Sequence, residues 1–151
     1  MVDQSAVGRE FTPVIARVEP GRLRFFFDTL GEANPVYRDE GATRAAGYSA
    51  TPVPPTYLFC LEMMEATVPF EFLTALDIDL ARVLHGEQRF DYFAPVVVGD
   101  VLTFRPRVTS VTDKKGGAMT LIVVETKATN QNGVHVADIS RTVVVRNPRP
   151  S

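Results

Sequence analysis

The chain has 151 residues, enough for one domain with a hydrophobic core but too few for a second domain of similar size. Hydrophobic residues make up 45% and charged residues 23% of the chain, a balance that is typical of globular proteins and excludes a disordered chain. The formal net charge is −2 and the lysines and arginines are scattered, which excludes a strongly basic nucleic-acid-binding surface. No apolar stretch approaches the ~20 residues that a membrane-spanning helix needs, and no signal peptide is visible. With a single cysteine, these features predict one cytoplasmic domain over residues 1–151, with no disulfide and no membrane insertion.

The first third of the chain predicts a short strand followed by two helices. Residues 11–18 are a strand candidate, and Pro20 stands at the tolerated first position of a helix that extends to about residue 32. The apolar residues of this helix recur at spacings of three and four and form one face: Leu23, Phe26, Phe27 and Leu30. Asp39 is a plausible N-cap for a second helix over 40–46, and Gly47 is a plausible end to it.

The most apolar helix of the chain is predicted directly after a proline-rich segment. The prolines of "TPVPP" (51–55) exclude a helix there, whereas residues 56–68 are apolar around most of the helix circumference, as in a buried helix. Cys60 lies in this run, and a structural thiol is the simplest interpretation of it. Glu62 and Glu65 interrupt the run, and we expect them to face away from its apolar side. A looser segment follows over 69–84.

The second half of the chain predicts an antiparallel sheet. Runs rich in Val, Thr, Ile and Phe with a period of two occupy residues 85–96, 100–112, 118–129 and 134–146. The segments "DKKGG" and "NQNG" between the later runs are typical of hairpin turns, because Gly and Asn accept a positive φ. Four long strands and one very apolar helix predict an α+β fold in which a sheet wraps around that helix.

Metal and nucleotide sites find no support in the sequence. The two histidines, His85 and His135, and Cys60 do not have the spacing of a metal-ligand set. The glycines match neither a dinucleotide-binding fingerprint nor a P-loop. We therefore expect no cofactor.

Three segments together resemble a known family: "NPVYRDEGATRAAGY", "PVPPTY" and "HGEQRFDYFAPVVVGDVL". They are similar to MaoC-type dehydratases and hydratases, specifically the N-terminal-domain branch that resembles the acyl-chain-binding subunits of mycobacterial hydroxyacyl dehydratases. The resemblance extends from about residue 8 to residue 146. It implies a hot-dog fold, an antiparallel sheet wrapped around a long central helix, with two such units pairing. It also implies trans-2-enoyl and 3-hydroxyacyl thioesters as substrates, carried on coenzyme A or on acyl carrier protein.

The family's catalytic motif is altered in this chain. Catalytic members carry Gly-Asp-x-Asn-Pro-x-His, and the matching residues here run from Gly31 to Tyr37, with Glu32 in place of the aspartate and Tyr37 in place of the histidine. A tyrosine, with an ordinary pKa of about 10, is a poor base at neutral pH. The glycine N–H that catalytic members offer at the start of the central helix is also missing, because Pro54-Pro55-Thr56 stands there.

The resemblance and the positions of these residues in the chain give two sets of candidate site residues. The candidate catalytic residues are Glu32, Tyr37 and His85, the last because it begins the first long strand and could face the pocket. The candidate substrate-binding residues are Asn34, Pro55, Thr56, Tyr57, Leu61 and Met64. The alternative interpretation of Gly31–Tyr37 is purely structural, with Asn34-Pro35 shaping a turn and Tyr37 packing against a tunnel or a neighbouring unit.

Three functions remain open on the sequence alone. In the first, the chain is the acyl-chain-binding subunit of an (R)-specific enoyl-thioester hydratase or 3-hydroxyacyl-thioester dehydratase, and a second hot-dog chain supplies the Asp and His. In the second, a homodimer works through Glu32, helped by His85 or Tyr37. In the third, the chain is a non-enzymatic module that binds acyl thioesters. An exposed sheet edge favours a dimer in each case.

Overall fold

The structure, a computed structural model, describes residues 2–148. Its helices are α1 (Pro20–Leu30), α2 (Glu40–Ala45), α3 (Tyr57–Glu65) and α4 (Glu71–Ala75), and its strands are β1 (Val14–Arg17), β2 (Val83–Tyr92), β3 (Val101–Lys114), β4 (Met119–Thr129) and β5 (His135–Arg146). Short 3-10 helices occupy Gln4–Ala6, Pro35–Tyr37 and Leu80–Arg82. The predicted elements all occur, with ends displaced by a few residues.

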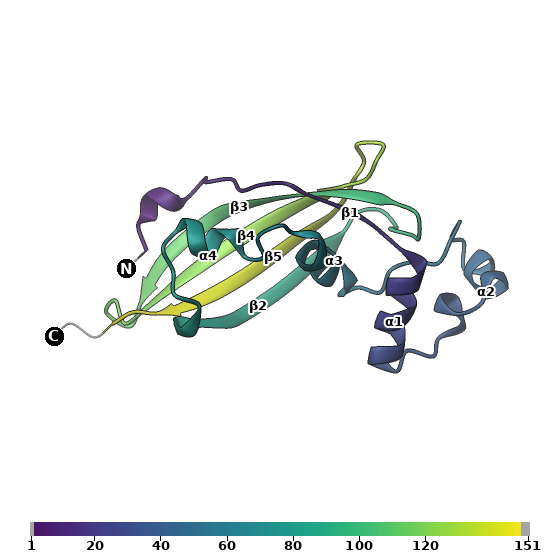
Figure 1. The fold of residues 1–151 in the computed structure, drawn as a ribbon, viewed down its shortest axis with the longest axis horizontal. Coiled ribbons are helices and arrows are strands. Elements are labelled where there is room, and N and C mark those ends of the chain that lie inside the picture. The colour runs from purple at the N-terminus through teal and green to yellow at the C-terminus, as the bar shows by residue number, and fades with distance from the viewer. Residues whose placement is uncertain (1, 149–151) are drawn as a thin grey trace.

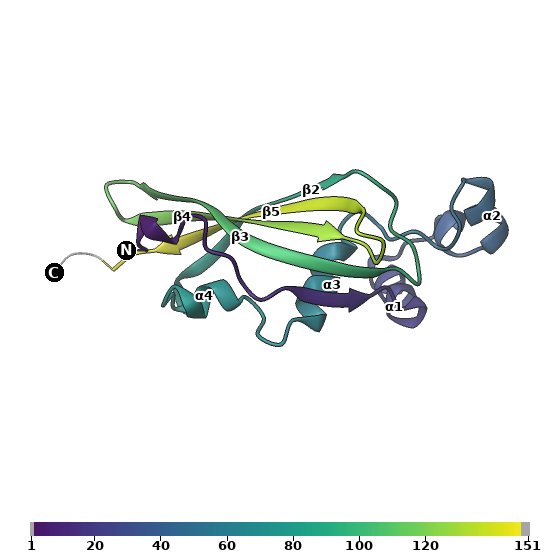
Figure 2. The same ribbon diagram turned by 90° about the horizontal axis from the view of Figure 1, so that it is seen from above.

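The strands form one antiparallel sheet in the order β1-β3-β4-β5-β2. Figure 2 shows the sheet from the side, with α3 and α4 on one face, while α1 and α2 lie toward one end of the molecule (Figure 1). This arrangement confirms the predicted α+β hot-dog architecture. The long strand β2 forms one edge of the sheet, and the four-residue strand β1 forms the other.

The inner face of the sheet carries two hydrophobic clusters. The first surrounds the N-terminal part of α3 and includes Leu23, Phe27, Tyr57, Leu61, Phe104 and Ile139. The second lies under α4 and includes Phe11, Phe72, Val108, Ile122, Val143 and Val145. Their inward-facing residues alternate with exposed ones along β3, β4 and β5, as the period of two predicts.

The central helix differs from the prediction in length and in the direction of one side chain. α3 has nine residues and ends at Glu65, because Ala66 turns to an extended conformation and no helical residue follows before Glu71. Glu62 does not face away from the core: it is buried with 5% of its surface exposed and pairs with Arg141 of β5. Glu65 does lie at the surface, where it pairs with Arg22 of α1.

The segment between α1 and α2 is built from local caps. Gly31 ends α1 with a φ of 66°, in the left-handed region that glycine adopts without strain. The carboxylate of Asp39 accepts a hydrogen bond from the Ala42 N–H at 2.8 Å, which confirms the predicted N-cap of α2. Gly47, with a φ of 90°, follows the end of α2 as predicted.

Two features of residues 2–148 bear on broad function classes. None of the helices there is long and apolar enough to cross a membrane. No group of three or more His, Cys, Asp and Glu side chains in that range is placed to hold a metal ion.

The cap of α2 gives a first prediction about stability. Replacing Asp39 with Ala removes the acceptor for the Ala42 N–H and should lower the free energy of unfolding by about 1 kcal/mol in urea denaturation. Asp39→Asn keeps a side-chain oxygen acceptor and should stay within a few tenths of a kcal/mol of the parent protein. Equal losses in the two variants would show that the cap is not the stabilising interaction.

Candidate active site and family membership

The altered motif forms a tight turn whose own side chains close it. A carboxylate oxygen of Glu32 accepts a hydrogen bond from the Asn34 N–H at 2.8 Å, and the side-chain oxygen of Asn34 accepts one from the Val36 N–H at 3.0 Å. Asn34 is thereby the N-cap of the 3-10 helix that ends at Tyr37. The Glu32 carboxylate is engaged by the backbone of its own turn.

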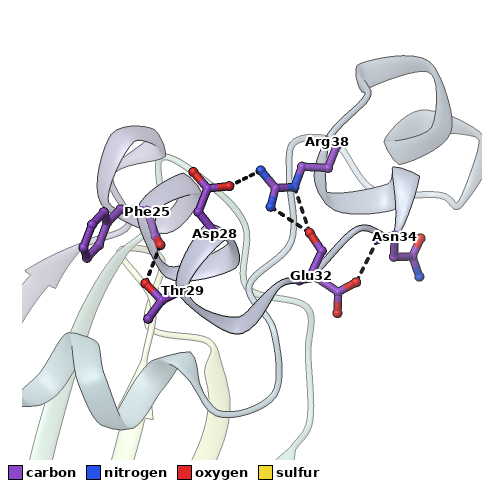
Figure 3. A network of polar contacts seen from close by, with 6 residues as sticks. All are labelled: Phe25, Asp28, Thr29, Glu32, Asn34 and Arg38. Atoms are coloured by element: carbon purple, nitrogen blue, oxygen red, sulfur yellow. Dashed lines mark hydrogen bonds and ion pairs between the residues drawn. The ribbon is translucent and has the colours of Figure 1, made fainter.

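Arg38 fastens this turn to α1 (Figure 3). Its Nε and one terminal nitrogen donate to the carbonyl oxygen of Glu32 at 3.0 and 2.7 Å, and the other terminal nitrogen pairs with Asp28 at 2.6 Å. The guanidinium also lies over the ring of Phe27, 5.7 Å from its centroid. Because one planar group binds three sites at once, the turn is rigidly oriented relative to α1.

A pocket of about 420 Å³ opens beside this turn. Its lining consists of three tyrosines and a set of small apolar residues: Val36, Tyr37, Tyr48, Pro52, Val53, Pro55, Tyr92, Phe93, Ala94, Pro95 and Val96. The ring of Tyr37 packs against Phe27, with 4.8 Å between the centroids. The pocket therefore lies between the motif, the proline-rich segment and the end of β2.

The tyrosines of this pocket are suited to donating hydrogen bonds. Burial raises the pKa of Tyr37, and the nearby Glu32 and Tyr48 raise it further. Burial also raises the pKa of Tyr92 far above its usual range, with a smaller contribution from Tyr37. Both phenols stay protonated at neutral pH, so neither acts there as a base that removes a proton from water.

The start of α3 offers few backbone donors to the pocket. Pro54 and Pro55 have no N–H, and the N–H of Tyr57 donates to the carbonyl oxygen of Pro54 at 3.0 Å. The hydroxyl of Tyr92 donates to the carbonyl oxygen of Pro55 at 2.8 Å, which ties β2 to this segment. Among residues 54–57, only the N–H of the exposed Thr56 is left for a substrate oxygen.

The candidate substrate-binding residues separate into two groups. Asn34, Pro55 and Thr56 lie at or beside the pocket. Tyr57 and Leu61 are fully buried in the first hydrophobic cluster, where Tyr57 meets Phe26 edge-on, and Met64 points outward with 51% of its surface exposed. A role for these last residues in binding an acyl chain stays a prediction.

The candidate catalytic residues are not all close together. Glu32 lies close to Tyr37, and of the two only Tyr37 lines the pocket. His85 lies near the other end of β2, opposite Val143, whereas Tyr92 lies opposite Ala137. His85 and Tyr92 are seven positions apart along the strand, a distance of about 20 Å. The His85 ring lies instead near Phe59 of α3, with 6.3 Å between centroids.

Three residues that shape the site were not among the sequence candidates: Arg38, Tyr48 and Tyr92. Tyr92 could have been found, because the alternation in "RFDYF" places Phe90 and Tyr92 on the same face of the strand, and the two rings do stack. Arg38 gave no such signal, because its partners are a backbone carbonyl and an aspartate of the preceding helix.

The link between Tyr92 and Pro55 gives a second prediction. Tyr92→Phe removes the donor to the Pro55 carbonyl and should destabilise the protein by about 1 kcal/mol at neutral pH, measured by thermal or urea unfolding. Because the folded state raises the pKa of Tyr92, the parent protein should lose stability as the pH rises above about 10, and the variant should lose less. Tyr48→Phe is the matched control in the same pocket. If the free energy of unfolding falls equally with rising alkaline pH in the parent and in Tyr92→Phe, this role of Tyr92 is contradicted.

Known proteins resemble this chain both in sequence and in fold. The model of the "FAS1-like, dehydratase domain region" matches residues 5–139. A "UPF0336 protein" of Thermobifida fusca is 32% identical over 151 residues, which cover 99% of this chain and 97% of the relative. Among solved structures, the C-terminally truncated HadBC (3R-hydroxyacyl-ACP dehydratase) complex of Mycobacterium tuberculosis is similar with a TM-score of 0.80 and 24% identity, over 92% of this chain and 96% of the matched one.

A protein described as a MaoC-like dehydratase is also similar in fold, with a TM-score of 0.82 and 22% identity, over 95% of this chain and 43% of that longer one. At these identities the structural matches establish the fold, whereas the family model covers most of the chain. The chain therefore belongs to the family described as the FAS1-like dehydratase domain region, and it shares its hot-dog fold with the MaoC-like dehydratase.

Proposed function

We propose that this chain is the acyl-thioester-binding subunit of an (R)-specific enoyl-thioester hydratase or 3-hydroxyacyl-thioester dehydratase. A second hot-dog chain would supply the aspartate and histidine that exchange protons with the substrate. Its pocket would hold the thioester near the tyrosines, with the substrate carried on coenzyme A or on acyl carrier protein. The solved relative described as a 3R-hydroxyacyl-ACP dehydratase complex supports this substrate class by analogy of fold.

One observation carries the proposal: the turn of the motif is intact, but the groups that would move protons are gone. Hydration needs a base that accepts a proton from water, an acid that delivers one to the α-carbon, and donors for the enolate oxygen. Glu32 does not line the pocket and is bound within its own turn, Tyr37 has a raised pKa, and His85 lies far along β2. Phenol hydroxyls can still donate hydrogen bonds to a thioester carbonyl.

The edge of the sheet supports pairing with a second chain. β2 is the terminal strand of the sheet and has ten residues, most of them exposed. Exposed apolar side chains lie at Leu84 within it and at Phe93 directly after it. A long unpaired edge of this kind is a template for strand addition. Tyr92 ends β2 and also lines the pocket, so a partner strand that pairs with β2 would border the pocket and could place its own side chains there.

The placement of Glu32 keeps the homodimeric enzyme as a second candidate. Its carboxylate is half-buried and close enough to Tyr37 to raise the pKa of that phenol. If the Asn34 N–H releases the carboxylate when substrate binds, Glu32 could act as the base. This mechanism requires activity from the chain alone.

The third prediction separates the two candidates. The purified chain alone should show no loss of enoyl absorbance with a panel of short to long trans-2-enoyl-CoA thioesters, because its pocket lacks a base. Addition of a catalytic MaoC-like hot-dog chain from the same organism should give turnover. In that pair, Glu32→Gln should change kcat by less than about tenfold, since removal of a general base costs ~100-fold or more.

Glu40→Gln is the matched control, because Glu40 is an exposed glutamate on the neighbouring α2. Turnover by the chain alone that disappears in Glu32→Gln, but not in Glu40→Gln, would overturn the subunit proposal in favour of the homodimer. Saturable acyl-CoA binding without turnover in any combination would instead indicate a non-enzymatic binding module.

A further inference from the structure

The outer face of the sheet carries no helix. By outer face we mean the face opposite α3 and α4, over which none of the helices of residues 2–148 lies (Figure 2). Its side chains come from the strand positions that alternate with the buried ones. The pairing of the strands arranges these side chains in rows that cross β3, β4, β5 and β2. The composition of two of these rows points to a partner.

One row carries four charges in the order positive, positive, negative, negative. From β3 to β2 it consists of Arg105, Lys127, Asp138 and Asp91, each directly opposite the next. Like charges directly opposite each other destabilise a sheet, and this row has one such pair at each end. Neither Arg105 nor Lys127 forms an ion pair within residues 2–148. The row therefore has free positive charge on one side and two adjacent carboxylates on the other.

A second row of the outer face is apolar. Leu121 of β4 lies opposite Val144 of β5, and Val144 lies opposite Leu84 of β2. Leu84 has 52% of its surface exposed, and the other two are half-buried. Val123 and Met119, the outward residues of β4 on either side of Leu121, are half-buried as well. Together these side chains form a continuous apolar patch, a feature that marks interaction surfaces.

We propose that the outer face binds the outer face of a second copy of this chain. The two copies are related by a two-fold axis that runs parallel to the strands, between β4 and β5, as in an aligned sandwich of two sheets. This axis places β4 of one copy over β5 of the other, and β3 over β2. The proposal goes beyond the proposed function, because it uses neither the tyrosine pocket nor the unpaired edge of β2.

The two-fold axis places each charge of the charged row against an opposite charge. Lys127 of one copy faces Asp138 of the second copy, and Arg105 faces Asp91 of the second copy. Symmetry repeats both contacts. Each carboxylate already has a contact within its own chain, at 2.7 and 2.8 Å, but a carboxylate has about four lone-pair sites and can accept another donor. The order of charges in this row is thus complementary to itself.

The row next to the charged one contributes little. Here Arg107 faces Arg89 of the second copy, but each arginine has an acid beside it in its own chain. Arg107 lies directly opposite Glu125, and Arg89 pairs with Asp91 at 2.8 Å. Because exposed charges with such neighbours interact weakly, this row neither favours nor opposes the pairing strongly.

The same axis brings the two apolar patches together. Leu121 of one copy faces Val144 of the second copy, and symmetry repeats this contact, so that water leaves both patches. With strands about 4.8 Å apart and outward residues about 6.7 Å apart along each strand, four strands and five rows cover on the order of 600 Å² on each copy. This is below the ~800 Å² per partner of a standard interface, so we expect a dissociation constant in the micromolar range.

Sedimentation equilibrium of the purified chain tests the apolar contact. The molar mass of the parent protein should double between about 1 and 500 µM, as expected for an interface of this size. Leu121→Glu places a charge against Val144 of the second copy and should keep the mass at its low-concentration value. Leu30→Glu, the same replacement at an exposed position of α1, is the matched control and should double as the parent does. Equal masses of the parent and Leu121→Glu at every concentration would overturn the proposal, whether that mass is one chain or a pair formed through β2.

Charge reversal tests the two-fold arrangement. Lys127→Glu should raise the dissociation constant about tenfold, because two symmetry-related ion pairs become contacts between like charges. Adding Asp138→Lys restores opposite charges, both between the copies and between β4 and β5, and should return the constant to within about threefold of the parent value. Arg44→Glu, at an exposed arginine of α2, is the control that should leave the constant unchanged. A double variant as weak as Lys127→Glu, or a Lys127→Glu variant as tight as the parent, would contradict the arrangement.

Discussion

The position of α3 on the sheet depends on the buried pair between Glu62 and Arg141. α3 is only nine residues long, and Glu62 is the residue through which it makes buried polar contacts with the strands, to Arg141 of β5 and to the Thr126 hydroxyl of β4. Removing one partner would leave a buried charge at a cost of about 3–5 kcal/mol, a large part of the stability of a domain of this size. Because α3 begins directly after Pro54-Pro55, its position also sets Pro55, which receives the hydroxyl of Tyr92. The tyrosine pocket thus depends on an interaction at the other end of the helix.

The candidate active site combines a rigid turn with side chains that are poor bases at neutral pH. Arg38, the Glu32 carboxylate and the cap at Asn34 hold the turn as firmly as a catalytic site needs, since small displacements of reacting groups are costly. The side chain that this frame presents to the pocket is the phenol of Tyr37, and its raised pKa keeps it protonated and able to donate at neutral pH. The hydroxyl of Tyr92 already donates to the Pro55 carbonyl. A site of this kind can position and polarise a thioester carbonyl, whereas proton removal needs another group. The exposed edge at β2, next to the pocket, is where a partner chain could bring one.

Local patterns predicted most of the fold, and contacts between distant residues account for the differences. The period of two gave the long strands, and Asp39 and Gly47 gave the limits of α2, because alternation and capping depend on neighbouring residues. The burial of Glu62 against the sheet was not predicted, because its partner, Arg141, is 79 positions away and no local signal links them. In the site, Glu32 and Tyr37 lie together because a short turn joins them, whereas the place of His85 depends on the path of β2 along the sheet. Arg38 went unrecognised because its main partner is a backbone carbonyl, which any residue could supply.

We infer that the tyrosine pocket binds the thioester of an acyl carrier at the interface with a second hot-dog chain. A crystal structure of the protein in its natural assembly, grown with a saturated acyl-CoA that cannot be hydrated, tests it most directly. We expect the thioester carbonyl within hydrogen-bond distance of Tyr37 or of the Thr56 N–H, with a partner strand paired to β2 and the partner's side chains facing the same pocket. A thioester bound elsewhere on the chain would contradict this assignment. So would an empty tyrosine pocket in crystals grown with an excess of the acyl-CoA.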